Sequence, residues 1–427
     1  MGLRDFLSEL EEDSLLTKVN SQKDPYLEIA GVLRENPTQP HLFEDVKGSA
    51  YKVAAGVCAN RSLFAKALGC EREELLSRIT QAIKHPLKPE RVSEAPCKDV
   101  VVGDPDLSEL PVLTHSSRDM GPYITAGVWV SYDKKWGLNA DYHRACPISE
   151  NELVVRVCQR DMHRYLKEND PLPCAICIGL HPSVSLAASV SQTPGTDELA
   201  IANSLKPLEL VRCESMDVWV PSEAEIVVEG TLTASKRHSE GPFPDITRTY
   251  DKVRDEPVFT VNCVTHRRNP IYQALLPAYS EHFLLMGMPR EPTIFEEVSR
   301  VVDCRNVLLT EGGSSWLHAV VQIAKKQPED GLKAVEAAFK GHASLKHCVV
   351  VDEDIDPYDP HDVEWAVATR CQFDENARVW RDRGSSLDCS AEPAGDTDRL
   401  TTAKLALDAT IPWDKGRRNF VKAELGV

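Results

Sequence analysis

The stretch Ser239–Asp245, which reads SEGPFPD, places two acids, Glu240 and Asp245, five positions apart. The glycine and the two prolines between them cannot form a regular helix, because proline fixes φ and has no N–H to donate. The stretch is therefore predicted to be a rigid loop that holds two carboxyl groups in a fixed geometry. Neighbouring acids, or an acid beside an arginine, acquire different pKa values, so one can donate a proton while the other stays charged. The alternative interpretation is a solvated turn after a strand.

Length and composition indicate a two-domain globular protein. The chain has 427 residues, too many for one ordinary core, with 42% hydrophobic and 27% charged residues. No apolar run approaches the ~20 residues that a membrane span needs. The acidic, amphipathic start MGLRDFLSELEED is unlike a secretory signal. We therefore expect a cytoplasmic protein with no membrane partner.

The net charge and the cysteine pattern limit the partners and the metal or disulfide sites to expect. A net charge of −17 argues against nucleic acid as a partner, because affinity for phosphate backbones rests on Lys and Arg. The thirteen cysteines are scattered through apolar segments, which indicates buried, reduced thiols. The one CxxC motif, Cys174 to Cys177, lies in LPCAICIGL and reads as a buried strand. Residues three apart on a strand point to opposite faces, so we expect neither zinc nor a disulfide there.

The order of predicted elements gives an α/β (α+β) fold. Apolar spacing predicts helices at the start of the chain over residues 3–20, 25–35, 61–69 and 71–84. Residues 99–276 then read as short strands and turns. This block is predicted to form one large sheet or a split barrel that carries the site.

Helices interrupt this block and follow it. They are predicted over residues 160–169 and 184–190 within the block, and over 329–340 in a second α/β region. A linker-like stretch covers residues 381–399. We predict two domains, 1–280 and 281–427.

Several polar residues could carry chemistry. Arg144 follows LNADYH at a strand end, and its permanent charge suits a substrate carboxylate, although pairing with a structural acid is the simpler interpretation. Asn139, His163 and Glu198 offer an amide oxygen, an imidazole and a carboxylate, a set that suits manganese or magnesium better than zinc. The plain alternatives are a core histidine at His163 and a helix cap at Glu198. Lys404 in TTAKLALDAT could meet a phosphate or could snorkel.

The chain contains no GxGxxG, GxxxxGK[ST] or GxSxG motif. This absence argues against nicotinamide, P-loop and serine-hydrolase chemistry.

A series of motifs occurs in a fixed order from about residue 100 to 412. They are N-x4-R at Asn139 and Arg144, then His163, the PG-x2-E turn ending at Glu198, ELVRCE, AEIVVEG, EGPF-x-D, DEDIDPYDPHDVEWAVATR and AKLALDAT. In this order they resemble the UbiD family of prenylated-flavin-dependent decarboxylases. The resemblance implies a split-barrel N-terminal domain that binds the flavin. It also implies a C-terminal α/β domain through which a dimer or hexamer forms.

The resemblance also implies roles for individual residues. The catalytic triad falls on Arg144, Glu240 and Asp245, with Asp245 as the proton donor. Contacts to prenylated FMN fall on Asp141, Tyr142, His143, Arg144, Met162, Ala188 and Lys404. Manganese or magnesium would be bound by Asn139, His163 and Glu198 with the cofactor phosphate, and potassium by the carbonyl groups of Ala187, Ala188 and Val190. Substrate contacts fall on His282 and Arg290.

The chemistry of decarboxylation requires a cofactor independently of this resemblance. Loss of CO2 leaves an electron pair on carbon, and no side chain is a good electron sink, so a cofactor must serve. The chain departs from many members in two places. Pro244 stands where glycine is common and stiffens the loop, and the lead-in to Arg144 is bulky.

The stretches GPFPDITRTYD, VTHRRNPIYQALLP and EHFLLMGMPREPTI favour one substrate. They resemble short archaeal-type members that convert trans-anhydromevalonate 5-phosphate to isopentenyl phosphate in a modified mevalonate pathway. Arg248 and Arg267–Asn269 could then bind the phosphate. An alternative is a reversible decarboxylase of aromatic, furan or pyrrole acids, and another is a non-enzymatic flavin-binding protein. Expected partners are a small carboxylic acid and a prenylated-flavin synthase.

Overall fold

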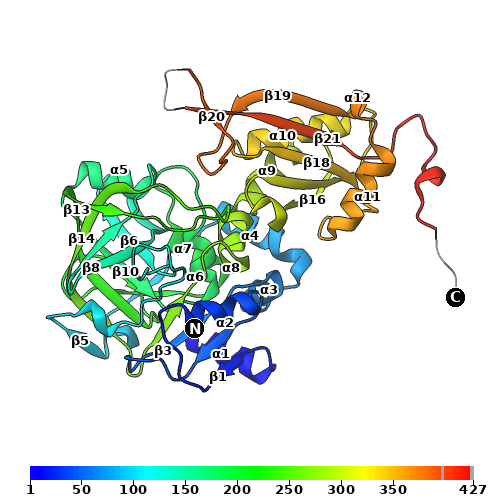
Figure 1. The fold of residues 1–427 in the computed structure, drawn as a ribbon. Helices are drawn as coiled ribbons and strands as arrows, with labels where there is room; N and C mark the ends of the chain where they lie inside the picture. The colour runs from blue at the N-terminus through cyan, green and yellow to red at the C-terminus, as the bar shows by residue number, and fades with distance from the viewer. Residues whose placement is uncertain (396–398, 424–427) are drawn as a thin grey trace. The chain divides into compact units, whose positions relative to one another are not determined.

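A computed structural model describes residues 1–395 and 399–423 (Figure 1). Two compact units follow one another along the chain, Met1–Leu285 and Met286–Val427. The stretch 381–399, predicted as a linker, is partly strand, and its residues 396–398 lie outside the described residues. No helix in the described part of the chain is long and apolar enough to cross a bilayer.

The first unit opens with helices that pack on a four-stranded sheet of order β1-β2-β3-β15. The elements here are α1 (Leu3–Glu12), β1 (Thr17–Val19), α2 (Glu28–Glu35), β2 (His41–Phe43), β3 (Lys52–Ala55), α3 (Arg61–Leu68), α4 (Leu75–Lys84) and β15 (Ile271–Ala274). The apolar face of α1 buries Phe6 and Leu10 against Leu42 and Ala54 of the sheet.

The helix predicted over residues 3–20 is too long. The N–H groups of Leu15 and Leu16 both donate to the Leu10 carbonyl, at 2.8 and 3.2 Å, and Ser14 takes a φ of 58°. The chain therefore turns out of the helix and continues as β1. Leu15, which fits the apolar spacing of a longer helix, is 46% exposed.

An eight-stranded sheet forms the centre of the first unit, in the order β7-β6-β10-β13-β14-β9-β8 with β5 on β14. Its strands are β5 (Val100–Val102), β6 (Val128–Asp133), β7 (Gly137–Tyr142), β8 (Ala145–Ser149), β9 (Glu152–Val155), β10 (Leu172–Ile178), β13 (Ile226–Glu240) and β14 (Arg254–His266). Ile176, Ile226, Val228 and Phe259 lie in its main core. The long strand β13 runs from this core to Glu240, its last residue.

Smaller elements complete the first unit. They are α5 (Asp161–Glu168), α6 (Pro182–Ala188), α7 (Glu198–Leu205), and the three-stranded sheet of β4 (Glu90–Val92), β11 (Glu209–Arg212) and β12 (Trp219–Pro221). Helix α8 (Ser280–Gly287) begins in the first unit, and its last two residues belong to the second. Cys174 and Cys177 are fully buried on β10, which confirms the predicted strand. All thirteen cysteines are free thiols, and ten of them are buried.

The second unit is a three-layer α/β/α arrangement. Its sheet has the order β16-β17-β18-β21-β19, with β20 on β21. The elements are α9 (Glu291–Ser299), β16 (Cys304–Leu309), β17 (His318–Ile323), α10 (Asp330–Gly341), β18 (His347–Asp352), α11 (Pro360–Arg370), α12 (Phe373–Asn376), β19 (Ala377–Arg383), β20 (Glu392–Pro393) and β21 (Leu400–Asp408). Helices α9 and α10 pack on one face of the sheet, and α11 packs on the other.

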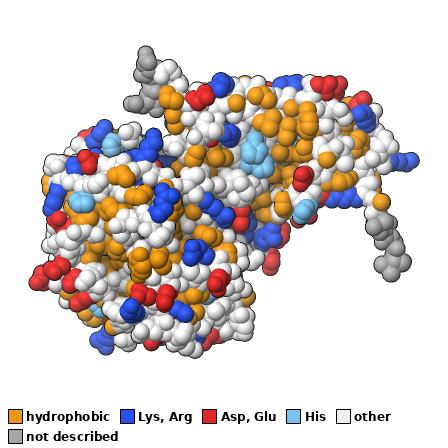
Figure 2. Space-filling view, in the orientation of Figure 1, with side chains coloured by type: hydrophobic (Ala, Val, Ile, Leu, Met, Phe, Trp, Pro, Cys, Tyr) orange, Lys and Arg blue, Asp and Glu red, His pale blue; other side chains and the backbone are white. Residues whose placement is uncertain are grey.

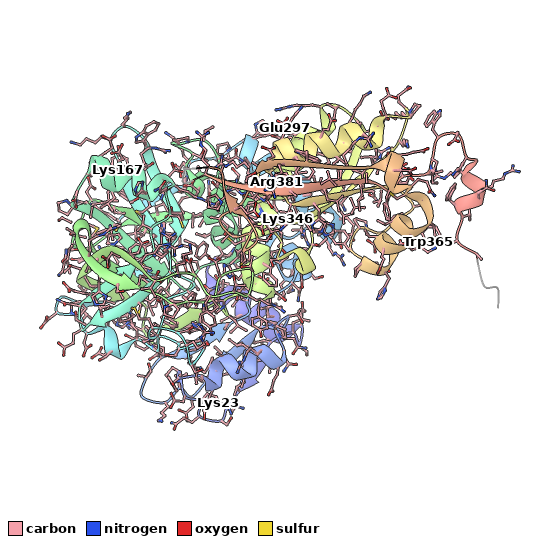
Figure 3. The ribbon with its side chains drawn as sticks, turned by 45° about the horizontal axis from the view of Figure 1, so that its top comes forward. Lys23, Lys167, Glu297, Lys346, Trp365 and Arg381 are labelled. Carbon is pink, nitrogen blue, oxygen red and sulfur yellow. The ribbon has the colours of Figure 1, made fainter. Side chains whose placement is uncertain are left out.

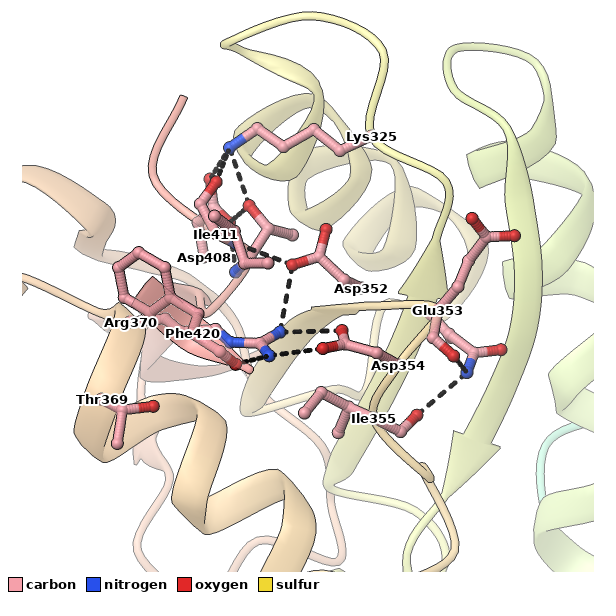
Figure 4. Close-up of polar contacts among 12 residues, drawn as sticks. Lys325, Asp352, Glu353, Asp354, Ile355, Thr369, Arg370, Asp408, Ile411 and Phe420 are labelled. Atoms are coloured by element: carbon pink, nitrogen blue, oxygen red, sulfur yellow. Dashed lines mark hydrogen bonds and ion pairs between the residues drawn. The ribbon is translucent and has the colours of Figure 1, made fainter. Parts of the chain in front are cut away.

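A buried ion network joins α11 to the ends of β18 and β21 (Figure 4). Arg370 is only 1% exposed; it donates to Asp352 at 3.2 Å and to both oxygens of Asp354 at 3.0 and 2.7 Å. Asp352 also accepts the N–H of Ile411 at 2.7 Å. The Arg370 guanidinium lies 5.0 Å from the ring centre of Trp365, which Figure 3 labels on α11. One cation therefore fixes three separate segments of the second unit.

Candidate active site

Arg144 and Glu240 form a two-pronged ion pair at the heart of the predicted site. Arg144 lies between β7 and β8, and its Nε and Nη2 donate to the two oxygens of Glu240 at 2.8 and 2.9 Å. Glu240 is fully buried. Burial opposes the charged form of Arg144, but the hydrogen bonds and charge of Glu240 outweigh it and raise the pKa of Arg144. The structure thus brings together two residues that stand 96 positions apart.

Three further residues hold this pair, and none of them was predicted. Tyr123 donates its hydroxyl to Glu240 at 3.0 Å, and Asp251 accepts from Arg144 Nη2 at 3.1 Å. The ring of Phe243 lies 5.1 Å from the Arg144 guanidinium. No spacing pattern points to Tyr123 or Asp251, because strand pairing and loop packing bring them in from distant positions. Arg144 Nη1 has no partner among the described residues and remains available for a substrate anion.

The loop after β13 holds Asp245 in a tight turn. Its N–H donates to the Thr249 carbonyl at 2.9 Å, and its own carbonyl accepts from the N–H of Arg248 at 2.8 Å. Asp245 Oδ1 accepts the N–H of Ile246 at 2.7 Å, and Oδ2 has no partner within residues 1–395 and 399–423. The predicted loop with two fixed carboxyl groups is therefore present. It begins at Gly241 rather than at Ser239, because β13 extends through Glu240.

His282 of α8 belongs to the same site. The N–H of Ala278 donates to Nδ1 of His282 at 3.0 Å, so the ring proton of the neutral imidazole is on Nε2. Burial lowers the pKa of His282, the charge of Asp245 opposes this shift, and the charge of Arg144 adds to it. Ala278, which bonds to His282, also accepts from Arg248 Nε of the Asp245 loop at 3.1 Å.

Glu281, the neighbour of His282, is a buried carboxyl group. Its two oxygens accept the N–H groups of Gly56 and Cys58 at 3.1 and 2.9 Å, and burial raises its pKa to about 7. It also lines a small pocket with Leu33, Asn36, Pro37, Gln39, Gly56, Leu276 and Tyr279.

The raised pKa of Glu281 makes the stability of the first unit depend on pH. Stability from the neutral carboxyl group is fully present below its ordinary pKa of 4.5 and is lost as the pH rises through about 7. The loss amounts to about 3 kcal/mol of the free energy of unfolding. Glu281→Gln cannot ionise, so we expect wild type to lose this amount relative to the variant between about pH 4.5 and pH 8.

Urea unfolding of both proteins across this pH range measures the difference. The exposed Glu73→Gln substitution is the matched control. A constant difference in unfolding free energy between wild type and Glu281→Gln at all pH values would contradict the assignment.

The predicted metal ligands are only partly brought together. Glu198 begins α7, as predicted, and accepts the N–H of Ala140 at 3.0 Å, next to Asn139 on β7. Burial raises the pKa of Glu198, and the charges of Asp141 and Asp161 add to this. A buried carboxylate in acidic surroundings suits a cation, as does the amide of Asn139, whose nitrogen has no partner in the described part of the chain.

His163 of α5 has different neighbours. Burial lowers its pKa, and Lys167, Glu256 and Arg237 are the charged groups that act on it. Within the described residues, no three His, Cys, Asp or Glu side chains converge as metal ligands. The assignment of His163 to the metal therefore stays a prediction.

Three family models together match almost the whole chain. They are the 3-octaprenyl-4-hydroxybenzoate carboxy-lyase N-terminal domain over residues 7–83, its Rift-related domain over 90–280 and its C-terminal domain over 283–409. The chain belongs to the UbiD family of carboxy-lyases. The resemblance drawn from the ordered motifs is thereby confirmed.

Individual UbiD relatives match over their full length. The anhydromevalonate phosphate decarboxylase of Methanothermobacter thermautotrophicus is 42% identical over 419 residues, which cover 96% of this chain and 97% of that protein. The UbiD-class enzyme HmfF from Pelotomaculum thermopropionicum in complex with FMN superposes with a TM-score of 0.95 at 38% identity, covering 100% and 97% of the two chains. An evolved dimeric form of HmfF in complex with prFMN gives 0.90 at 36% identity, covering 99% and 98%.

The remaining residues predicted to contact the cofactor lie in varied surroundings. Met162 is buried in the main core, and Ala188 is the buried last residue of α6. Tyr142 follows Asp141 at the end of the edge strand β7. His143 Nε2 faces Asp141 Oδ1 at 3.0 Å; burial opposes its charged form, but Asp141 raises the pKa of His143. Of the predicted potassium ligands Ala187, Ala188 and Val190, the Ala187 carbonyl accepts the N–H of Val190 at 3.0 Å.

Two predicted residues lie in the second unit. Lys404 is buried, and its ammonium donates to the carbonyl groups of Ala343 and Leu345 at 2.7 and 2.6 Å. These bonds give Lys404 a structural role, and its contact with a phosphate stays a prediction. Arg290 lies with its guanidinium 5.6 Å from the ring centre of Trp316, and its substrate contact likewise stays a prediction.

The phosphate role suggested for Arg267 and Arg268 stays a prediction, and the two arginines differ in their surroundings. Arg267 pairs with Glu223 at 2.7 Å and lies 3.9 Å from Glu225. Arg4 donates to Glu225 and to the carbonyl group of Arg268. Two acids therefore pair with Arg267, whereas Arg248 pairs with no carboxylate among the described residues.

Proposed function

We propose that this UbiD-family protein converts trans-anhydromevalonate 5-phosphate to isopentenyl phosphate and CO2, with prenylated FMN as its cofactor. The observation that carries the proposal is the buried Arg144–Glu240 pair with Asp245 and His282 beside it. Its substrate follows that of the relatives named anhydromevalonate phosphate decarboxylase, which are up to 42% identical. The FMN and prFMN bound in the HmfF structures support the cofactor.

Prenylated FMN, when bound, supplies the electron sink that loss of CO2 requires. Asp141, Tyr142, His143, Arg144, Met162 and Ala188 would hold it in the first unit. Asn139, Glu198 and His163 would bind the accompanying Mn²⁺ or Mg²⁺, and the carbonyl groups at the end of α6 a K⁺. The acidic, buried surroundings of Glu198 fit such a divalent cation.

The protein's own groups place the acid and move a proton. Arg144 Nη1 binds the substrate carboxylate while Glu240 fixes the other side of the guanidinium. As the bond between carbon and carboxylate breaks, CO2 leaves, and the remaining electron pair takes a proton from Asp245. Asp245 then takes up a proton from solvent. One proton enters and one CO2 leaves in each turnover.

We further infer that residues 1–280 form the cofactor-binding, split-barrel part and residues 281–427 the oligomerisation part. A dimer or hexamer is the proposed assembly, and the dimeric form of HmfF supports self-association. A prenylated-flavin synthase is the proposed supplier of the cofactor.

The test is an anaerobic decarboxylation assay of protein produced together with a prenylated-flavin synthase. We expect CO2 from trans-anhydromevalonate 5-phosphate and at most about one hundredth of that rate from furoate-type and benzoate-type acids. Turnover of a ring acid in preference would keep the acid/base site and overturn the proposed substrate. Absence of turnover with every acid would support the flavin-binding alternative.

A further inference from the structure

Two arginines lie at the loop that carries Asp245: Arg248 is part of the loop, and the segment of Arg118 is bonded to it. Arg118 lies with its guanidinium 4.1 Å from the ring centre of Tyr250. Arg248 lies 5.0 and 5.4 Å from the ring centres of Tyr279 and Phe283. Both side chains are exposed, whereas the Arg144–Glu240 pair is buried, so these arginines stand at the solvent side of the site.

The segments that carry these arginines are fastened to the Asp245 loop. The hydroxyl groups of Ser116 and Tyr250 form a hydrogen bond of 2.5 Å, and the N–H of Met120 donates to the Pro242 carbonyl at 3.3 Å. Within the loop, Arg248 Nε donates to the Ala278 carbonyl at 3.1 Å. The same residue Ala278 donates its N–H to His282. The two guanidinium groups are therefore held at set positions around Asp245.

Neither guanidinium is neutralised. Figure 2 shows basic and acidic side chains interspersed on this face of the molecule. Arg144, Arg156 and Arg254 all pair with Asp251. Within residues 1–395 and 399–423, by contrast, no carboxylate pairs with Arg118 or Arg248. Both Nη groups of Arg248 and every side-chain N–H of Arg118 stay free for a ligand.

The backbone at Arg248 is also unusual. Its φ is +61°, in the left-handed region that residues other than glycine rarely adopt. Such conformations cost free energy and persist where the surroundings fix them, commonly at ligand sites. Here the bond from Arg248 N–H to the Asp245 carbonyl closes the turn. The position of Arg248 is thereby coupled to that of the proposed proton donor.

We propose that Arg118 and Arg248 form the subsite that binds the phosphate of the substrate, so that the phosphate lies at the solvent side while the carboxylate meets Arg144. The inference rests on the proposed function and names residues for its specificity. Guanidinium forks match the oxygens of a phosphomonoester and add two positive charges to a dianion.

Equilibrium binding of isopentenyl phosphate tests the subsite separately from turnover. We expect Arg118→Met and Arg248→Met each to raise its Kd about 10- to 100-fold, because each removes charged hydrogen bonds to the anion. Binding of the uncharged analogue isopentenol is expected to change less than about twofold. Arg212→Met is the matched control, because Arg212 pairs with the exposed Asp217 on the separate three-stranded sheet.

Arg118→Met keeps the test valid if Arg248→Met disturbs the loop, because the Arg118 side chain makes no hydrogen bond within the described residues. Unchanged Kd values in both variants overturn the subsite. Equal losses for isopentenyl phosphate and isopentenol also overturn it, since they indicate a general loss of the pocket. If wild type binds isopentenyl phosphate through these arginines but does not decarboxylate the phosphorylated acid, the subsite stands and the proposed substrate falls.

Discussion

Replacing Asp245 by Asn is expected to slow decarboxylation by about 10²–10⁴-fold, the usual contribution of a positioned proton donor. The amide keeps the shape of the side chain, and its oxygen can still accept the N–H of Ile246, so the loop should hold its conformation. It has no acidic proton to deliver to carbon. The loss should therefore appear in kcat, with little change in KM.

The measurement is CO2 release by the cofactor-loaded variant under anaerobic conditions. Flavin absorbance reports whether the variant carries as much cofactor as wild type. Asp255→Asn is the matched control, because Asp255 is an exposed acid on β14 beyond the loop. Near-normal turnover by a folded, loaded Asp245→Asn protein would remove Asp245 from the mechanism.

Replacing Arg370 by Met is expected to destabilise the second unit by about 3–5 kcal/mol. The substitution leaves the buried carboxyl group of Asp352, and the exposed one of Asp354, without their cation, and the penalty at Asp352 exceeds the value of the lost bonds. Urea unfolding of the full-length protein measures it. Trp365 lies against Arg370, so its fluorescence contributes a signal for the unfolding of this unit.

Arg381→Met provides the contrast. Arg381, labelled in Figure 3, pairs with Glu392 on the surface, where both side chains are more than half exposed. Its loss is expected to cost less than about 1 kcal/mol. Adding Asp352→Asn and Asp354→Asn to Arg370→Met should restore part of the stability, because no unpaired charge then remains. Equal effects of Arg370→Met and Arg381→Met would show that the buried network is not the stabilising feature.

Local sequence signals predicted local structure well. The predicted helices over 61–69 and 329–340 appear as α3 and α10, and the turn before Glu198 caps α7 through the Asp197 side chain. These outcomes depend on capping and apolar spacing within one segment. The prediction failed at Leu15, where a single hydrogen-bond acceptor, the Leu10 carbonyl, redirects the chain.

The assembly of the site was beyond local signals. Arg144 lies between β7 and β8, and β6 and β10 separate β7 from β13, so its meeting with Glu240 depends on the folding of the whole sheet and leaves no trace in either segment. The ordered motifs supplied these residues through family resemblance. They did not supply Tyr123 or Asp251, which complete the surroundings of the pair. They also assigned Lys404 to a phosphate without indicating that its ammonium group donates hydrogen bonds to two backbone carbonyl groups.

The strand β13 has a consequence for how the protein can evolve. It runs unbroken for 15 residues, from the core at Ile226 to the acid at Glu240. Because side chains alternate between faces, an insertion or deletion of one residue would turn Glu240 away from Arg144. Pairing with β14 slips at two places, Glu229/Gly230 and Thr233/Arg237, and at Gly230 a Cβ would lie 2.2 Å from the Thr260 carbonyl oxygen. Changes in length can therefore be absorbed only between Thr233 and Arg237. The rest of the strand can change by substitution alone, because its length fixes the position of Glu240.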